Sequence, residues 1–363
     1  MQKFKRLIEC YVPIYACNFR CEYCYIKQNH NRSFSDKVIP FKFEPSYIAS
    51  CLSVKRLGGT CLINLCAGGE TLLSPQTVEL AKLLLNEGHF VMIVNNGTCT
   101  KQINDLLTID PSLRNRLWMR FSLHWNELER LNLINMFFDN VNKCKNAGCS
   151  IAVEMVASDS YIPHISNIID VCQKRIKSLP EINIARSEHD YSILTSLNKE
   201  DYYKTWSVFN SASFDFKKKT VGVKRLEFCY AGEWSATLDL DSGLLSKCYT
   251  HPIQNIFKDP NEPIKFEAIG KNCLAPYCFN SHLFLAMGNI PCLDFPSIAA
   301  IRGKECSDGT RWLTKEMEDF VGQKVFNNNK KYSSVKRNFL GFKSFLIKIV
   351  DSLQNKKRRK NGK

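Results

Sequence analysis

The chain has 363 residues, 44% of them hydrophobic and 23% charged, which is typical of a globular protein with room for one large domain and a smaller one. No run of 18 apolar residues occurs, so the sequence predicts no membrane-spanning helix. The net charge of +15 lies mostly in residues 324–363, where 13 Lys and Arg stand against one Asp. That segment carries +12, and only +3 remains for the rest of the chain.

The 17 cysteines indicate a reducing compartment. Their number is odd, the chain is long and no export signal is evident, and these three features argue against a disulfide framework. We therefore expect a cytoplasmic protein whose thiols are free or bound to metal.

Residues 5–195 alternate between short apolar runs and longer amphipathic stretches. Each apolar run is rich in Ile, Val, Leu or Phe, as buried parallel strands are. The predicted strands are Leu7–Ile14, Cys61–Leu65, Phe90–Val94, Leu117–Leu123, Ser150–Val156 and Ile182–Ala185. The predicted helices between them include Ser74–Glu87, Glu127–Ala147 and Ile165–Lys177. Six strand–helix units at this spacing predict an α/β fold, a parallel barrel or partial barrel.

Three cysteines follow the first predicted strand at the spacing C-x3-C-x2-C, namely Cys17, Cys21 and Cys24. Three thiolates can hold three irons of a [4Fe–4S] cluster and leave the fourth iron open to a small molecule, whereas ferredoxin clusters have four protein ligands. A zinc site and a chance grouping are the alternatives, and zinc sites usually combine two cysteine pairs. The aromatic Tyr23, between the second and third cysteines, favours the cluster.

The pattern C-x3-C-x-aromatic-C resembles the signature of radical S-adenosylmethionine (radical SAM) enzymes, which Cys17, Cys21, Tyr23 and Cys24 match position by position. The resemblance implies a partial (β/α)6 TIM-like barrel with the cluster on the loop after the first strand. It also implies that the three cysteines ligate the cluster, that SAM chelates the open iron, and that Tyr23 lies near the adenine.

Sites in barrels of this type lie at the carboxyl ends of the strands. After the second strand, Gly68-Gly69-Glu70 offers close backbone approach to a ligand and a carboxylate that can accept hydrogen bonds from an ammonium; the alternative is a plain turn. The segment resembles the Gly-Gly-Glu motif of the family, which contacts the SAM amino group. The same resemblance places Asn96 and Ser122 near SAM and lets Arg186 reach its carboxylate.

Two further polar residues belong to the later strands of the predicted barrel. His124 follows the fourth strand, and Glu154 lies in the fifth. Both are weak candidates for catalytic proton transfer. The alternative is that they are simply polar residues of a barrel mouth, since such mouths are polar whatever the chemistry.

A second group of cysteines begins beyond about residue 215, where the strand–helix pattern stops. Cys229 and Cys248 flank Asp241-Ser242-Gly243, a turn signal between two short strands, so both cysteines can meet across a hairpin. Cys273 and Cys278 follow, with a proline-containing turn between them. The first half, C-x13-G-x4-C, resembles the opening of SPASM and twitch extensions, which hold auxiliary [4Fe–4S] clusters.

The later spacing departs from the SPASM pattern, and we therefore predict one auxiliary cluster, as in twitch extensions. Its expected ligands are the four cysteines just named, with Cys292 or His282 as a substitute. A zinc ion bound by the same four sulfurs is the alternative.

The predicted division is a radical SAM core at 1–215, an auxiliary-cluster domain at 216–322 and a basic amphipathic tail at 323–363. Apolar residues recur in the tail at helical spacing, at Phe339, Phe342, Leu346, Ile349, Val350 and Leu353, before the basic run 356–360. Such a helix can lie on an anionic membrane, so the protein could be membrane-associated through it. The alternative is a helix docked on the barrel. The basic run has no interleaved aromatic residues, which argues against nucleic acid.

The resemblance implies that a reduced cluster cleaves SAM to methionine and a 5′-deoxyadenosyl radical, which abstracts hydrogen from a substrate. It requires a reducing partner such as flavodoxin or ferredoxin. Two substrate classes compete: a peptide or protein, as for many SPASM enzymes, and a small sugar-like molecule, as for some twitch enzymes. The cluster motif begins at residue 17, so we expect no preceding peptide-recognition domain. The rival class is a non-catalytic iron–sulfur electron carrier or sensor, against which the Gly-Gly-Glu motif argues.

Overall fold

The computed structural model describes residues 2–26, 28, 37–249, 251–271, 273–278 and 282–342, without the side chain of His282. Six parallel strands in chain order form the core of the fold, as predicted. They are β1 Arg6–Val12, β2 Cys61–Ala67, β3 Phe90–Asn95, β4 Leu117–Ser122, β5 Ser150–Ala157 and β6 Glu181–Ile184. Most strand residues are buried on both faces, because helices cover the outside and side chains from the other strands occupy the inside.

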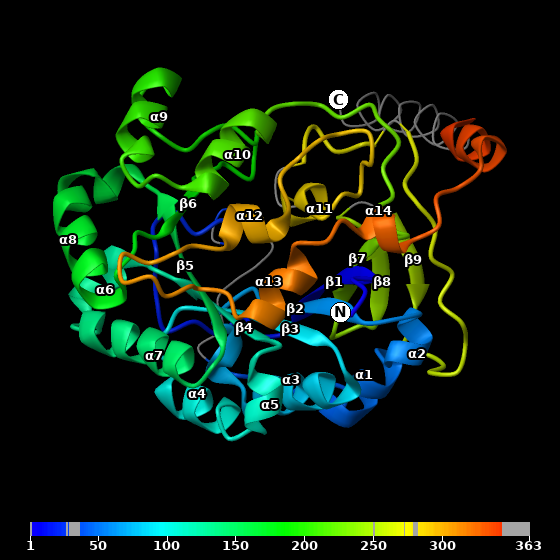
Figure 1. Ribbon diagram of the computed structural model, residues 1–363, viewed down its shortest axis with the longest axis horizontal. Helices are drawn as coiled ribbons and strands as arrows, with labels where there is room; N and C mark the ends of the chain where they lie inside the picture. The colour runs from blue at the N-terminus through cyan, green and yellow to red at the C-terminus, as the bar shows by residue number, and fades with distance from the viewer. Residues whose placement is uncertain are drawn as a thin grey trace, which may run out of the picture.

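Helices connect these strands and form an arc around the sheet (Figure 1). They are α1 Pro45–Cys51, α2 Val54–Leu57, α3 Pro75–Glu87, α4 Thr100–Leu106, α5 Pro111–Arg114, α6 Trp125–Arg130, α7 Ile134–Asn146 and α8 Ile165–Ile176, with the 3-10 turns η1 Thr71–Leu73 and η2 Asp159–His164. The start of α3 follows the sequence prediction: the Ser74 side chain caps the helix and proline occupies the first turn. The repeated strand–helix order confirms the partial TIM-like barrel.

The predicted helix Glu127–Ala147 is wrong as a single element. It is divided into α6 and α7 by a turn at Asn132, whose φ is +55°. Apolar residues continue at helical spacing on both sides of the turn, so hydrophobic periodicity does not reveal the break. Asparagine adopts the left-handed conformation more readily than most residues, which allows the chain to turn there.

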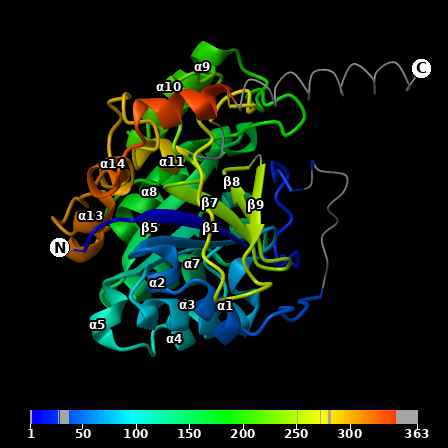
Figure 2. The same cartoon turned by 90° about the vertical axis from the view of Figure 1, so that its right-hand side faces the viewer.

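The sheet does not end at β1. The hairpin predicted around Asp241–Gly243 forms β7 Ser235–Asp239 and β8 Leu244–Lys247, and β9 His251–Asn255 extends it. Strand β7 pairs in parallel with β1, so nine strands form one continuous sheet in the order β6-β5-β4-β3-β2-β1-β7-β8-β9. Figure 2 shows the hairpin beside β1. The second cysteine group is therefore built on the same sheet as the first.

Six further helices follow the barrel: α9 Lys199–Ser207, α10 Ala212–Thr220, α11 His282–Ala286, α12 Ile298–Arg302, α13 Lys315–Val321 and α14 Val325–Asn328. Helix α10 packs on β6 and α12 packs on α10, so both lie at the end of the sheet opposite β9 (Figure 1). These helices bring residues from the C-terminal third of the chain to the barrel.

The described part of the tail begins another helix at residues 334–342. Val335, Phe339 and Phe342 are 80%, 65% and 60% exposed, whereas Leu340 is buried. The other apolar residues predicted for this face and the basic run 356–360 lie outside the described residues. Within the described part, no helix is both long and apolar enough to cross a membrane.

Candidate active site

The three cysteines of the first motif lie on the loop that leaves the carboxyl end of β1, and each is partly buried. Burial raises the pKa of Cys17 to about 11 and that of Cys21 to about 12, and the neighbouring thiols of the motif add to both shifts. Because burial disfavours the charged thiolates, they need a positively charged partner to replace the stabilisation that water would give. Bound iron would supply it, because a coordinating thiol is deprotonated by its metal.

The Gly-Gly-Glu segment holds this loop through its backbone. The N–H of Gly69 donates to the carbonyl of Ile14 at 2.7 Å, and that of Glu70 donates to the carbonyl of Ala16 at 2.8 Å. A β-carbon on Gly69 would lie 2.0 Å from the Ala16 carbonyl oxygen, so only glycine fits there. The absence of a side chain at Gly69 therefore lets its own backbone pack against the cysteine loop. The sequence had instead predicted close approach to a ligand. A β-carbon on Gly68 would only contact the exposed ring of Tyr15.

The Glu70 side chain joins the ends of two strands. It is 3% exposed, and its two carboxylate oxygens accept the backbone N–H groups of Leu72 and Asn96 at 2.9 and 2.7 Å. Burial raises the pKa of Glu70 to about 7, although both hydrogen bonds lower it. A cationic group of a ligand placed beside this carboxylate would offset the cost of its burial.

Asn96 links the loop after β3 to the cysteine loop. Its Nδ2 donates to Oδ1 of Asn18 at 2.7 Å, and Nδ2 of Asn18 donates to the Thr98 hydroxyl at 2.9 Å. The Thr98 hydroxyl in turn donates to Oδ1 of Asn96 at 2.7 Å. The three side chains thus form a closed set of hydrogen bonds next to Cys17.

Tyr23 is held by residues from two other strand ends. Its hydroxyl lies 2.6 Å from Nδ1 of His124, after β4, and 2.6 Å from the hydroxyl of Tyr161, after β5. The Tyr23 ring also stacks on His124 and meets Tyr161 edge to face. Burial lowers the pKa of His124 to about 4, so the imidazole is neutral at neutral pH and fixes the orientation of the tyrosine.

Three further hydrogen bonds anchor the cysteine loop, and the sequence predicted none of them. Glu127 accepts the backbone N–H of Arg20 at 2.7 Å, and the Ser158 hydroxyl donates to Glu22 at 3.3 Å. Oε1 of Gln28 accepts the backbone N–H of Glu188 at 2.9 Å, after β6. Together with the contacts above, the loop after β1 touches residues that follow β2, β3, β4, β5 and β6. Only the folded barrel brings these residues together, so no local sequence pattern announces them.

The remaining predicted residues occupy different levels of the barrel. Ser122 ends β4 and is partly exposed at the mouth. Arg186 follows β6 and forms an ion pair with Glu188, while its guanidinium lies over the ring of Tyr25.

Glu154 lies deeper in the barrel, where Arg120 donates to both of its carboxylate oxygens at 2.7 Å. Although burial alone would raise the pKa of Glu154, Arg120 and Arg302 hold it well below the usual range.

The four cysteines predicted for an auxiliary site line one pocket of about 320 Å³. Cys229 is placed by backbone hydrogen bonds in both directions with Gly270, and Cys248 follows β8 with a left-handed φ of +50°. Lys224 donates to the carbonyl of Cys273, and the Cys273–Cys278 loop lies beside it. Burial, and then the three other thiols, raise the pKa of Cys229 well above its ordinary value.

The sequence also named Cys292 and His282 as substitute ligands for this site. Cys292 is exposed and is absent from the pocket wall, and the side chain of His282 lies outside the described residues. Tyr249, next to Cys248, lines the pocket and also contacts the barrel, where its ring centroid lies 6.3 Å from that of Tyr11 in β1. The two cysteine groups are thus separated by aromatic side chains at the mouth of the barrel.

Both groups suit a cluster that several thiolates share. Among the described residues, no three His, Cys, Asp or Glu side chains converge as the ligands of a single metal ion would. A [4Fe–4S] cluster tolerates wider spacing, because each thiolate binds a different iron. The first group offers three thiols beside the buried carboxylate of Glu70, and the second offers four thiols around one pocket.

Comparisons with known proteins agree with this architecture. The chain is 32% identical over 97 residues to a protein of Methanocaldococcus jannaschii described as a glycyl-radical enzyme activating enzyme. That match covers 26% of this chain and 34% of the relative, so the chain spans about a third of the curated relative's length. No family model matches.

Solved structures extend the likeness to most of the chain. The crystal structure of Streptococcus suis SuiB bound to S-adenosylmethionine matches with a TM-score of 0.50 and 12% identity, over 71% of this chain and 64% of SuiB. Native anSMEcpe with bound AdoMet matches with a TM-score of 0.46 and 13% identity, over 96% of this chain and 99% of that one. At 12% identity, the likeness to SuiB shows a shared fold.

Proposed function

We propose that this chain, a radical SAM enzyme by its fold and its three-cysteine motif, cleaves SAM reductively at the site formed by Cys17, Cys21 and Cys24. The observation that carries the proposal is the loop of three thiols held against the ends of five further strands, with the buried Glu70 beside it. A structural metal site needs no such carboxylate, and a bare electron carrier needs no open iron.

When bound, the [4Fe–4S] cluster supplies an electron and an open iron, and SAM supplies the 5′-deoxyadenosyl radical. The protein positions the reactants and excludes water. Glu70 would accept hydrogen bonds from the ammonium of SAM, with Asn96 and Ser122 as further residues of the SAM site. Arg186 would neutralise the SAM carboxylate. Tyr23, held by His124 and Tyr161, would lie near the adenine.

The second group, Cys229, Cys248, Cys273 and Cys278, is proposed to bind one auxiliary [4Fe–4S] cluster. Four partly buried cysteines around one pocket support this number of ligands. The cluster would accept an electron from the substrate radical or bind the substrate, so that the net reaction is an oxidation or modification. A structural zinc ion is the alternative occupant, and iron and zinc analysis of the purified protein distinguishes the two.

The substrate is proposed to be either a peptide or protein, or a small sugar-like molecule, held at the barrel mouth between the two cysteine groups. The description of the M. jannaschii relative names an enzyme as the target of activation, which favours a protein. Electrons would come from a flavodoxin or ferredoxin.

Anaerobic reconstitution followed by quantification of 5′-deoxyadenosine tests the proposed reaction. With dithionite as reductant, the wild-type protein is expected to release 5′-deoxyadenosine from SAM in the absence of substrate. Cys24→Ala should release none, whereas Cys292→Ala, at an exposed position outside both cysteine groups, should match the wild type. A fully loaded, reduced wild-type protein that leaves SAM intact would instead be an electron carrier or sensor.

The tail is proposed to contact anionic lipid. Val335, Phe339 and Phe342 share one exposed helical face, and the same helix carries the basic residues Lys336 and Arg337. Sedimentation with vesicles tests this: full-length protein should bind vesicles that contain 30% phosphatidylserine and ignore pure phosphatidylcholine. Phe339→Ser/Phe342→Ser should reduce binding strongly. Equal binding of the variant and the wild type would contradict the proposal.

A further inference from the structure

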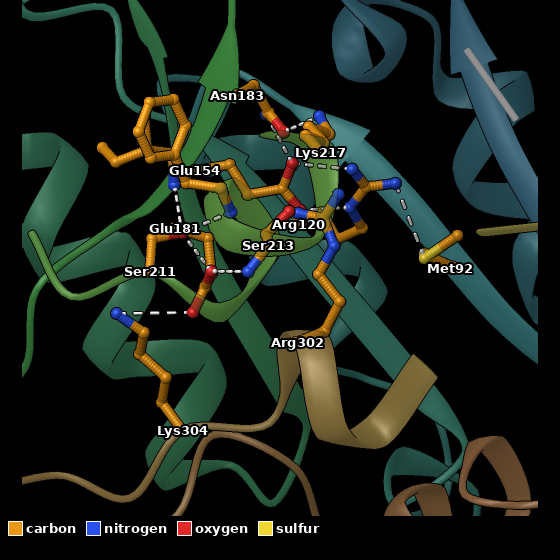
Figure 3. Close-up of polar contacts among 12 residues, drawn as sticks. Met92, Arg120, Glu154, Glu181, Asn183, Ser211, Ser213, Lys217, Arg302 and Lys304 are labelled. Carbon is orange, nitrogen blue, oxygen red and sulfur yellow. Dashed lines mark hydrogen bonds and ion pairs between the residues drawn. The ribbon is translucent and has the colours of Figure 1, made fainter. Parts of the chain in front are cut away.

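Below the mouth, the barrel contains a cluster of charged residues that SAM cleavage does not use. We call it the barrel-floor cluster; its members are Arg120, Glu154, Asn183, Lys217 and Arg302. Figure 3 shows how they meet: Arg120 and Glu154 project from β4 and β5, and Arg302 rises from α12 toward the same carboxylate. Asn183 of β6 donates to Glu154 at 3.0 Å. Arg302 is fully buried although it comes from the C-terminal third of the chain.

Lys217 differs from the other charged members because it has no carboxylate partner among the described residues. It extends from α10, is 9% exposed, and donates to Oδ1 of Asn183 (Figure 3). An ammonium has three N–H donors, so this single acceptor leaves hydrogen-bonding capacity unused. Lys304 in the same view provides the contrast, since it pairs with Glu181 at 3.3 Å and donates to the Leu179 carbonyl at 2.8 Å.

The cluster carries an excess of positive charge. Arg120 and Arg302 share one carboxylate, that of Glu154. Two other acids act on these arginines. Glu181 of β6 pairs with Lys304, and Glu9 of β1 accepts a hydrogen bond from Asn64 at 3.0 Å. Burial raises the pKa of Glu9, which favours its neutral form. The positive charges of the cluster therefore outnumber its negative charges, and a bound anion would be stabilised there.

The space above the cluster is open to a ligand. Inward-facing residues in the carboxyl halves of the strands retain solvent-accessible surface, although most of their neighbours in sequence are buried. These residues are Tyr11, Cys66, Val94, Ser122, Val156 and Asn183. Asn183 belongs to this layer and also accepts the hydrogen bond from Lys217, so the lysine lies one contact below the layer.

We infer that the barrel-floor cluster binds an anionic oxygen group of the substrate, a carboxylate or a phosphate, with Lys217 as its principal ligand. This inference rests on the proposed function, because it assigns the cluster to the substrate of that reaction. Burial, and then repulsion from Arg302, hold the pKa of Lys217 well below its ordinary value. Arg120 and Arg186 add to the repulsion, and Glu154 opposes it. A bound anion raises the pKa of Lys217 because it stabilises the protonated amine, so binding of the anion is coupled to the uptake of a proton.

Anion titration of the reconstituted holoenzyme tests the inference, with inorganic phosphate and acetate as probes at constant ionic strength. Calorimetry should detect saturable binding of at least one of them to the wild type; the probe that binds more tightly indicates whether the substrate group is a phosphate or a carboxylate. Lys217→Met should weaken binding about 10- to 100-fold, which corresponds to the loss of a hydrogen bond to a charged group. Lys304→Met, which removes a lysine that already has a carboxylate partner, should bind like the wild type.

The pH dependence supplies a second readout that a purely structural lysine would not produce. Acetate is fully ionised above pH 6, so its affinity should fall as pH rises only if the protein takes up the proton. Heats measured in two buffers of different ionisation enthalpy should show this uptake in the wild type. Lys217→Gln, which keeps a donor to Asn183, should lose it, and this variant also serves if Lys217→Met fails to fold.

Two results would overturn the inference: no saturable binding of either anion to the wild type, or equal affinity in the wild type and the Lys217 variants. Release of 5′-deoxyadenosine is measured on the same preparations. Wild-type protein that cleaves SAM without binding anions contradicts the barrel-floor site alone. Protein that binds anions without cleaving SAM contradicts the proposed reaction and leaves the site in place.

Discussion

The two cysteine groups are built in different ways. The first lies within eight residues of one loop, and the barrel positions that loop as a unit through contacts with five strand ends. The second combines a hairpin, Cys229 and Cys248, with the Cys273–Cys278 loop, so its geometry exists only after distant segments have packed. A local motif thus specifies the first site, whereas the fold of the extension specifies the second.

Iron content gives the largest expected effect, because the two sites should load independently. Replacing Cys17, Cys21 and Cys24 by Ala should remove about half of the iron and sulfide of the reconstituted protein and leave the second site loaded. Replacing the four pocket cysteines should remove the other half. Iron and sulfide analysis measures both, with Cys292→Ala as the matched control at full content. Complete loss of iron in either variant would show that the sites do not form separately.

A single methyl group should distinguish the two glycines that position the first site. Gly69→Ala places a β-carbon against the Ala16 carbonyl, where neither backbone can move freely, and should cost about 3 kcal/mol or more of the free energy of unfolding. Gly68→Ala, which contacts only the exposed Tyr15 ring, should cost less than about 1 kcal/mol. Denaturant unfolding of the apo protein measures both. Similar losses in the free energy of unfolding for the two variants would show that Gly69 does not hold the loop.

The difference between a local motif and a site assembled from distant segments also explains which features could be predicted from the sequence. Buried strands such as Phe90–Val94 are continuous apolar runs, and the structure confirms them within one or two residues. The pairing of β7 with β1 was not predicted, because a five-residue hairpin strand carries no signal for a parallel partner more than 200 residues away. Tyr161 and Glu127 anchor the cysteine loop, and Arg302 and Lys217 enter the barrel, from elements whose local sequences look like ordinary helix or turn.

The smallest expected effect concerns His124, which supports the first site through Tyr23. Its folded-state pKa of about 4 is below the ordinary 6.5, so the stabilisation is complete above pH 6.5 and is lost as pH falls toward 4. We expect the wild type to lose on the order of 2 kcal/mol relative to His124→Gln across this interval. Denaturant unfolding of both apo proteins at several pH values measures the difference. A constant difference would mean that the pKa of His124 is the same in the folded and the unfolded protein.

The most direct test of the central claim is the electron paramagnetic resonance spectrum of the reduced protein in which the four pocket cysteines are replaced by Ala. Only the cluster at Cys17, Cys21 and Cys24 remains in that variant. Binding of SAM to an open iron should change its spectrum, and 5′-deoxyadenosine should form as the signal decays. A loaded, reduced cluster whose spectrum is the same with and without SAM would contradict the account.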